Sequence, residues 1–218
     1  ELQNLLKIRR NTAVDNGVDI PYAMEKFCNH CILVMEYKDG ISLRKVIQDN
    51  KGNLYNKKLI ARNIVDTYLN QVYRDGEFHS DMHAGNILIN KNNTITIIDF
   101  GLISTIAIED RRAVVTMIYA FIKNNPKLVI QAQRDAGYIT DQVSINQKYC
   151  QSIKKLAHNF QGNFEMSKFT KELFTIMNNF DVYIPVHLLM LNKTILYVED
   201  VVRQIDRKST RLNSSHDQ

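Results

Sequence analysis

No run of apolar residues in this chain is long enough to cross a membrane, because charged or amide side chains interrupt every such run. The first four residues, Glu1-Leu2-Gln3-Asn4, contain no basic region followed by an apolar core, so we expect no signal peptide. The three cysteines cannot form an even disulfide framework, which fits the reducing environment of the cytosol. Together these absences predict a cytoplasmic protein.

Cysteine is also too sparse to indicate a zinc site. Cys28 and Cys31 enclose His30, but no second pair of cysteine or histidine residues follows at zinc-finger spacing. We therefore interpret this short segment as a turn between two strands.

Glycine is scarce, and the eight glycines form no Gly-x-Gly pattern, so the chain has no glycine loop of the kind that covers a nucleotide phosphate. Dense blocks of basic residues are lacking too. The net charge is +5, and the paired basic residues are Lys57-Lys58, Arg111-Arg112 and Lys154-Lys155. Such isolated pairs argue against nucleic-acid binding but are compatible with weak attraction to phosphate-bearing ligands or anionic lipid.

What remains is a chain that can bury a sizeable core, with 218 residues of which 44% are hydrophobic. We expect one domain over residues 1–206. The final residues, 207–218, are polar and aperiodic, so we expect them to be a disordered tail or an artefact.

The most informative segment is His79-Ser80-Asp81-Met82-His83-Ala84-Gly85-Asn86, which is followed by Asp99-Phe100-Gly101. Phosphoryl transfer in kinase-like folds needs one carboxylate to orient the attacking hydroxyl or water. It also needs an amide oxygen and a second carboxylate to hold magnesium. Asp81 is the candidate catalytic residue for the first role. Asn86 and Asp99 are the candidate metal ligands, because magnesium prefers oxygen donors.

The residues between these motifs predict a β-hairpin. Two β-branched runs, Ile87-Leu88-Ile89 and Ile95-Thr96-Ile97-Ile98, flank Asn90-Lys91-Asn92-Asn93, whose composition is typical of a turn. The hairpin would bring Asn86 at one end close to Asp99 at the other. Each motif alone is common in ordinary turns and loops, but their order, spacing and intervening hairpin together favour a phosphotransfer site.

Helical patterns dominate the remainder, so the predicted fold class is α+β, mostly α. A buried strand is predicted over 32–37, a short helix through Leu43, Val46 and Ile47, and a long amphipathic helix from Leu54 to Arg74. Further helices are predicted over 108–123, 126–136, 144–159, 165–179 and 186–206. We expect Leu69 on the long helix and Ile97 on the hairpin to be buried. This order of elements matches the helical C-terminal lobe of a protein kinase, with residues 32–37 as its hinge strand.

The motifs resemble those of the UbiB/AarF-domain family of atypical kinases, which is associated with ubiquinone biosynthesis. Aminoglycoside and choline phosphotransferases share much of the first motif, but three other stretches favour the UbiB family. Glu1-Leu2-Gln3-Asn4 followed by Arg9 or Arg10 is similar to the Glu-Ala-x-Asn helix of that family. The stretch Val34-Met35-Glu36-Tyr37-x-x-Gly40 is similar to its hinge, and Ile184-Pro185-x-x-Leu188-x-x-Leu191-x-Lys193 is similar to its C-terminal signature.

The resemblance implies a protein that binds ATP and Mg²⁺. It implies that Glu36 and Tyr37 offer main-chain groups to adenine at the hinge, and that Asn86 and Asp99 contact the nucleotide through the metal. Met35 is either a further nucleotide contact at the hinge or a core residue. The family's Ala-rich loop and phosphate-binding lysine would lie upstream of the first residue. We therefore expect this chain to lack most of the N-terminal lobe and to be inactive alone. One departure from the family's motif is Ala84, where a proline is usual.

The leading hypothesis is an ATP-dependent kinase or ATPase of UbiB type that supports ubiquinone and quinone-lipid biosynthesis. The implied location is cytoplasmic, with peripheral attachment at the bacterial inner membrane. The implied partners are ATP, a quinone-precursor lipid or the inner-membrane surface, and other quinone-biosynthesis proteins, with no nucleic acid.

Two alternatives stay open. One is a small-molecule phosphotransferase of the aminoglycoside or choline kinase type, and the other is a non-catalytic nucleotide-sensing scaffold. The phosphotransferase would need an acidic substrate pocket, whereas the helices beyond residue 140 intersperse their acidic residues with lysines.

Overall fold

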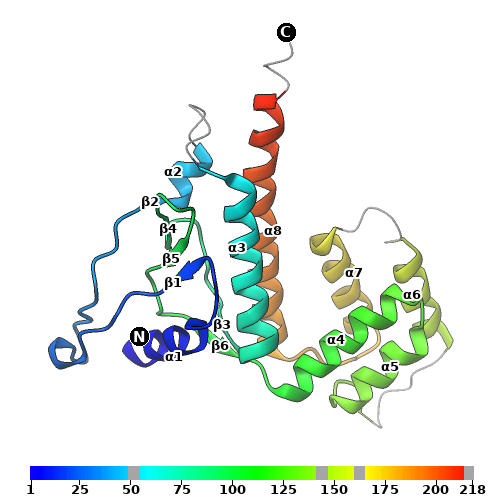
Figure 1. Ribbon diagram of the computed structural model, residues 1–218. Coiled ribbons are helices and arrows are strands. Elements are labelled where there is room, and N and C mark those ends of the chain that lie inside the picture. The colour runs from blue at the N-terminus through cyan, green and yellow to red at the C-terminus, as the bar shows by residue number, and fades with distance from the viewer. Residues whose placement is uncertain (49–54, 141–146, 160–164, 214–218) are drawn as a thin grey trace. The chain divides into compact units, whose positions relative to one another are not determined.

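The computed structural model describes residues 1–48, 55–140, 147–159 and 165–213, and the side chains among them as far as Ile205 (Figure 1). The chain folds into two compact units. Unit 1 consists of residues 1–104 and 197–218, and unit 2 consists of residues 105–196. The candidate site lies in unit 1. That residues 1–206 act as one domain stays a prediction.

Unit 1 contains a four-stranded sheet in the order β1-β5-β4-β2. Its strands are β1 (Val18–Asp19), β2 (Ile41–Ser42), β4 (Ile87–Ile89) and β5 (Ile95–Ile97). β4 and β5 form the predicted antiparallel hairpin, in which Ile87 pairs with Ile97 and Ile89 pairs with Ile95. All four isoleucines are fully buried, so the hairpin is part of the core, and the predicted burial of Ile97 is confirmed.

The hairpin turn uses asparagine side chains in place of glycine. Oδ1 of Asn90 accepts the backbone N–H groups of Asn92 and Thr94, at 2.9 and 3.0 Å. Asn93 adopts a left-handed backbone conformation with a φ of 63°, which asparagine tolerates better than most residues. The turn therefore fixes the pairing of the two strands, and with it the positions of the residues at their other ends.

Two short helices of unit 1 bury apolar residues at helical spacing. α1 (Leu2–Thr12) packs against β1 and buries Leu5 and Ile8 (Figure 1). α2 (Leu43–Gln48) buries the three residues that predicted it, Leu43, Val46 and Ile47.

The long predicted helix is present as α3 (Lys57–Leu69), which continues as the π-helical segment η2 (Asn70–Asp75). Its start is capped by the side chain of Asn56, which accepts the N–H of Leu59. Its end is set by Gly76, whose φ of 75° is a left-handed conformation that glycine adopts without strain. The predicted starting residue, Leu54, lies outside the described residues.

One side of this helix forms part of the core of unit 1. Its apolar residues at a spacing of four are buried: Ile60, Ile64, Tyr68 and Val72. Leu69 is 43% exposed, so the prediction that it is buried is wrong. At about 100° per residue, Leu69 lies on the side of the helix opposite to the buried residues.

The predicted buried strand over 32–37 is also wrong. This segment pairs with residues 22–24: the N–H of Met24 donates to the carbonyl of Val34, and the N–H of Glu36 donates to the carbonyl of Tyr22. Ile32 is 54% exposed and Tyr37 is 86% exposed. A short apolar run is buried only where other elements cover it, and here its two outer residues face solvent.

Unit 2 is helical. Its helices are α4 (Ile108–Ile122), α5 (Pro126–Asp135), α6 (Gln147–Asn159), α7 (Met166–Asn179) and the first part of α8 (Val186–Asn213). The five predicted helices are therefore confirmed, although the predicted start of the third, at 144, lies outside the described residues. The last helix continues to Asn213, so its predicted end at 206 is wrong. Edge-to-face ring pairs, Phe121 with Phe169 and Tyr149 with Phe180, help to form the core of this unit.

Among the described residues, no helix is both long enough and apolar enough to pass through a bilayer.

Candidate functional site

The β4–β5 hairpin brings the two predicted metal ligands into contact. Asn86 directly precedes β4, and Asp99 follows β5 after one residue. Nδ2 of Asn86 donates a hydrogen bond of 2.7 Å to Oδ2 of Asp99. The backbone of Asn86 takes part as well, since its carbonyl accepts the N–H of Ile98 at 3.0 Å. The predicted proximity of the two side chains is thus a feature of the fold.

The donor set of this pair suits a magnesium ion. Oδ1 of Asp99 accepts the N–H of Gly101 at 2.9 Å, so each carboxylate oxygen has one donor and keeps a second lone pair. Because Asn86 donates through Nδ2, its Oδ1 is the atom that would face a cation. Among the described residues no three His, Cys, Asp or Glu side chains form a metal cluster. Magnesium does not need one, since it commonly binds through one or two carboxylates together with phosphates and water.

His79 joins the backbone of the candidate catalytic residue to that of Asp99. It ends β3 (Glu77–His79), which pairs with β6 (Ile103–Thr105) in a separate two-stranded sheet. Nδ1 of His79 accepts the N–H of Asp81 at 3.1 Å, and Nε2 lies 2.8 Å from the carbonyl oxygen of Asp99. The first contact requires a lone pair on Nδ1 and the second requires a hydrogen on Nε2, so the ring is neutral.

Burial reinforces this neutral state. His79 is only 1% exposed, and desolvation lowers its pKa below the ordinary value of 6.5. Its backbone N–H donates at 3.0 Å to Oε1 of Gln71, a fully buried side chain on η2. The π-helical segment therefore places a polar group under the strand that leads to Asp81, in keeping with the frequent occurrence of such segments at functional sites.

The loop between Asp81 and Asn86 is closed by its own backbone. The N–H of His83 donates to the carbonyl of Asp81 at 2.8 Å, and the N–H of Asn86 donates to the carbonyl of His83 at 2.9 Å. Nδ1 of the His83 ring accepts the N–H of Gly85 at 3.1 Å. His83, whose role the sequence leaves open, thus helps to close the loop.

Ala84, in the middle of the loop, is hydrogen-bonded to residues of two helices. The N–H of Ala84 donates to the hydroxyl of Tyr197 on α8 at 2.6 Å. The carbonyl of Ala84 accepts the N–H of Arg44 on α2 at 3.2 Å.

Among the described residues, the hydrogen bonds and ion pairs of the predicted hinge residues go to other partners than Asp81, Asn86 and Asp99. Glu36 pairs with Lys38 at 2.9 Å and accepts the N–H of Tyr22, and the hydrogen bond to Lys38 is the main cause that lowers its carboxyl pKa. Tyr37 is almost fully exposed, and Met35 is half-buried and pairs with Ala23. The structure thus brings the side chains of Asn86 and Asp99 together, and His79 links the backbone of Asp81 to that of Asp99. The catalytic role of Asp81 and the nucleotide contacts of residues 35–37 stay predictions.

Sequence reasoning missed several residues that support the site. Gln71 had a detectable signal, because it is a polar residue on the apolar side of a helix. Tyr197 gave none, since 113 residues separate it from Ala84. Asn4 of α1 donates to the carbonyl of Phe100 at 2.8 Å, and Oε1 of Glu1 lies 3.4 Å from the N–H of the same residue. Both belong to the N-terminal stretch that carried the resemblance, although the sequence assigned neither of them to Phe100.

Comparison with known proteins identifies two family models that match this chain. Residues 1–133 match the family model of the ABC1 atypical kinase-like domain, and residues 153–209 match that of the UbiB helical domain. The chain is 31% identical over 213 residues to the "Probable protein kinase UbiB" of Shewanella halifaxensis, and 30% identical over 213 residues to that of Shewanella oneidensis. In each case 94% of this chain is covered, and the chain spans 38% of the length of the relative.

A solved structure has a similar fold. Rv3197 of Mycobacterium tuberculosis, determined in complex with erythromycin, aligns with a TM-score of 0.66 over 94% of this chain and 53% of its own. At 18% sequence identity the likeness concerns the fold alone. The predicted fold class, a mostly helical α+β arrangement of kinase-like type, is confirmed.

Proposed function

Because this chain belongs to the ABC1 atypical kinase-like family, we propose that it is the part of a UbiB-type kinase or ATPase that holds magnesium and orients the phosphoryl acceptor. The observation that carries the proposal is the 2.7 Å hydrogen bond between Asn86 and Asp99. The ring of His79 joins this pair to the backbone of Asp81. Family membership also bears out the resemblance drawn from the motifs.

Each residue of the cluster has a separate task in this proposal. Asp99 and Oδ1 of Asn86 hold Mg²⁺, which neutralises the phosphates of ATP when bound. Asp81 accepts the hydrogen bond of the attacking hydroxyl or water, and so aligns the acceptor. His79 stays neutral and holds the backbone at Asp81 and Asp99. Met35, Glu36 and Tyr37 remain the proposed nucleotide contacts at the hinge.

Mg²⁺-dependent nucleotide binding tests the proposal. The full-length protein is needed, because this chain spans 38% of the length of its relatives, and we propose that residues 1–206 alone bind Mg-ATP poorly. Calorimetry of the full-length protein should show ATP binding that strengthens markedly when Mg²⁺ is added. ATP binding of equal strength without Mg²⁺ would reject the metal-holding role of Asn86 and Asp99. A non-catalytic scaffold would bind the nucleotide but show no ATP turnover. Membership of the ABC1 atypical kinase-like family does not favour the alternative of a small-molecule phosphotransferase.

We also propose that the protein works in ubiquinone biosynthesis at a membrane surface, to which it attaches peripherally through α4. Five apolar side chains on one side of this helix are exposed, which we call the α4 stripe: Ile108, Val115, Ile118, Tyr119 and Ile122. Their spacing of three, four and seven residues places them along one stripe of the helix. Exposed apolar residues in a continuous stripe are typical of a binding surface.

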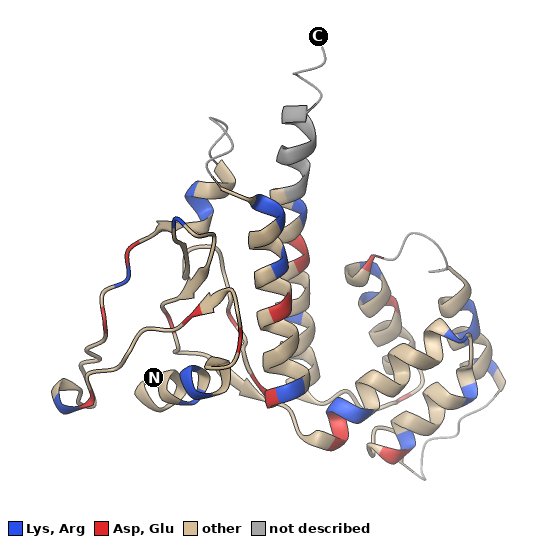
Figure 2. Ribbon diagram, viewed as in Figure 1, with Lys and Arg blue, Asp and Glu red and all other residues tan. Residues whose placement is uncertain are grey.

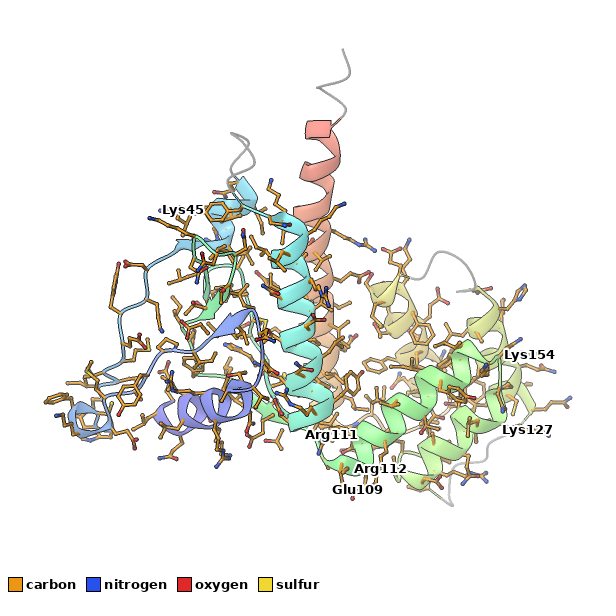
Figure 3. All side chains as sticks on the ribbon, viewed as in Figure 1. Lys45, Glu109, Arg111, Arg112, Lys127 and Lys154 are labelled. Atoms are coloured by element: carbon orange, nitrogen blue, oxygen red, sulfur yellow. The ribbon has the colours of Figure 1, made fainter. Side chains whose placement is uncertain are left out.

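The charges around the α4 stripe favour anionic lipid as the surface bound. Arg112 is exposed next to it, and Nζ of Lys123 lies 5.8 Å from the ring centroid of Tyr119. Residues 105–196 contain 11 lysines and arginines against 7 aspartates and glutamates. Arg112, Lys127 and Lys154 are exposed on α4, α5 and α6 (Figure 3). Figure 2 shows further Lys and Arg residues on the helices of unit 2. Apolar side chains bordered by basic ones are the pattern of helices that lie in a membrane interface.

A further inference from the structure

We infer that Tyr197 is a positioning residue that holds the catalytic loop in the shape required for Asn86 to bind magnesium. The inference rests on the proposed function, because it concerns the same metal site. Its basis is the 2.6 Å hydrogen bond from the N–H of Ala84 to the hydroxyl of Tyr197.

The bond is needed because Ala84 is buried, with 8% of its surface exposed. A buried backbone N–H is destabilising unless it has an acceptor. The loop carbonyls of His83 and Asp81 accept the N–H groups of Asn86 and His83, whereas the N–H of Ala84 donates to Tyr197. The hydroxyl of Tyr197 fills this role from a distant part of the chain.

The direction of the Tyr197 side chain is set by the packing of α8. Tyr197 is the first residue of α8 that belongs to unit 1. The residues that follow it at helical spacing, Val198, Val201 and Ile205, are buried. This buried side prevents the helix from rotating, so the hydroxyl stays in one place.

The effect on the metal site passes through two residues. The peptide groups of Ala84 are held at the N–H by Tyr197 and at the carbonyl by the N–H of Arg44. Asn86 is only two positions further along, and its side chain must reach Asp99. If Tyr197 released Ala84, the loop would gain freedom where Asn86 has to be held, and the metal would lose a well-placed ligand.

Proline at position 84 provides an independent test of this account. It removes the N–H that needs an acceptor and restricts the backbone, and it is the residue that the related motif usually carries. In an Ala84→Pro protein the hydroxyl of Tyr197 has no donor to serve. Tyr197→Phe should therefore matter when residue 84 is alanine and not when it is proline.

The experiment uses the full-length protein in five forms: wild type, Tyr197→Phe, Ala84→Pro, the double variant and Tyr183→Phe. Tyr183 is exposed and gives a matched loss of a hydroxyl. We expect Tyr197→Phe to weaken ADP binding with Mg²⁺ by about five- to tenfold, the equivalent of one buried hydrogen bond. ADP binding without Mg²⁺ should stay unchanged, as should all binding by Tyr183→Phe. In the Ala84→Pro background the same change should have no effect.

Amide hydrogen exchange of residues 80–88 in the nucleotide-free protein tests the hydrogen bond between Ala84 and Tyr197 directly. Exchange should be faster in Tyr197→Phe and unchanged in Tyr183→Phe. The inference is overturned if Tyr197→Phe weakens binding equally with and without Mg²⁺, if its effect persists in the Ala84→Pro background, or if exchange does not change. Wild-type protein that binds ADP without any Mg²⁺ dependence would instead reject the proposed function, and with it the inference.

Discussion

Nε2 of His79 lies 2.8 Å from the backbone carbonyl oxygen of Asp99, 20 residues further along the chain. One neutral imidazole thereby holds the backbone of Asp81 and that of Asp99 in place relative to each other. The ring is buried; its Nδ1 accepts a hydrogen bond and its Nε2 donates one. Protonation would remove the Nδ1 lone pair, so the arrangement depends on pH.

The stability of the protein should therefore fall on mild acidification through His79. Burial lowers the pKa of its imidazole in the folded protein below 6.5, so the unfolded chain binds the proton more readily. The contribution of this group is fully present above about pH 6.5 and is lost as the pH falls through the lower folded pKa. Urea denaturation at several pH values should show that the advantage of the wild type over His79→Gln shrinks below pH 6.5.

The matched control for this pH effect is His30→Gln, which changes an exposed histidine. Its stability curve should run parallel to that of the wild type at every pH. If the His79→Gln and wild-type curves are parallel as well, the buried ring is not the group that responds to acid.

Truncating the buried Ile97 should destabilise the protein far more than truncating the exposed Leu69. Ile97 is fully buried in the hairpin, so Ile97→Ala should lower the free energy of unfolding by about 2–5 kcal/mol. Leu69 is 43% exposed on the outer side of α3, so Leu69→Ala should change it by about 0.5 kcal/mol or less. Chemical denaturation measures both free energies of unfolding. Similar losses of stability in the two variants would contradict the orientation of α3 that leaves Leu69 exposed.

The α4 stripe should be required for membrane attachment. Val115→Glu places a charge in the middle of the stripe, and the lost burial of one valine, about 1.5 kcal/mol, predicts about tenfold weaker binding to vesicles with anionic lipid. Gln48→Glu adds the same charge at an exposed position of α2, in unit 1, and should bind like the wild type. Co-sedimentation that is equal for Val115→Glu and Gln48→Glu would refute attachment through α4.

The parts of the site that the sequence predicted correctly are those with local patterns. The β-branched runs before and after Asn90–Asn93 predict a hairpin, because each residue's preference agrees with its neighbours'. Once the hairpin is known, the contact between Asn86 and Asp99 follows from their places at its ends. The buried side of α3 follows in the same way from its 3.6-residue period.

The parts that the sequence did not predict depend on tertiary contacts. The apolar run at 32–37 looks like a core strand, but burial depends on what covers it, and Tyr37 is exposed. The apolar character of Leu69 predicts that it is buried, whereas its position around the helix leaves it 43% exposed. The hydrogen bond between Ala84 and Tyr197 joins residues 113 positions apart, and no local pattern relates such residues.

The central claim is that Asp99 holds the metal while Asp81 orients the acceptor. The most direct test measures Mg-ADP affinity and ATPase rate in the full-length protein for Asp99→Asn and Asp81→Asn. Asp99→Asn removes the negative charge that holds the cation, so Mg²⁺-dependent affinity should fall, and turnover with it. Asp81→Asn should leave Mg-ADP affinity nearly intact and lower turnover by about 10²–10⁴-fold. Equal losses of affinity in the two variants, together with equal losses of thermal stability, would contradict the account, because both aspartates would then only hold the loop together.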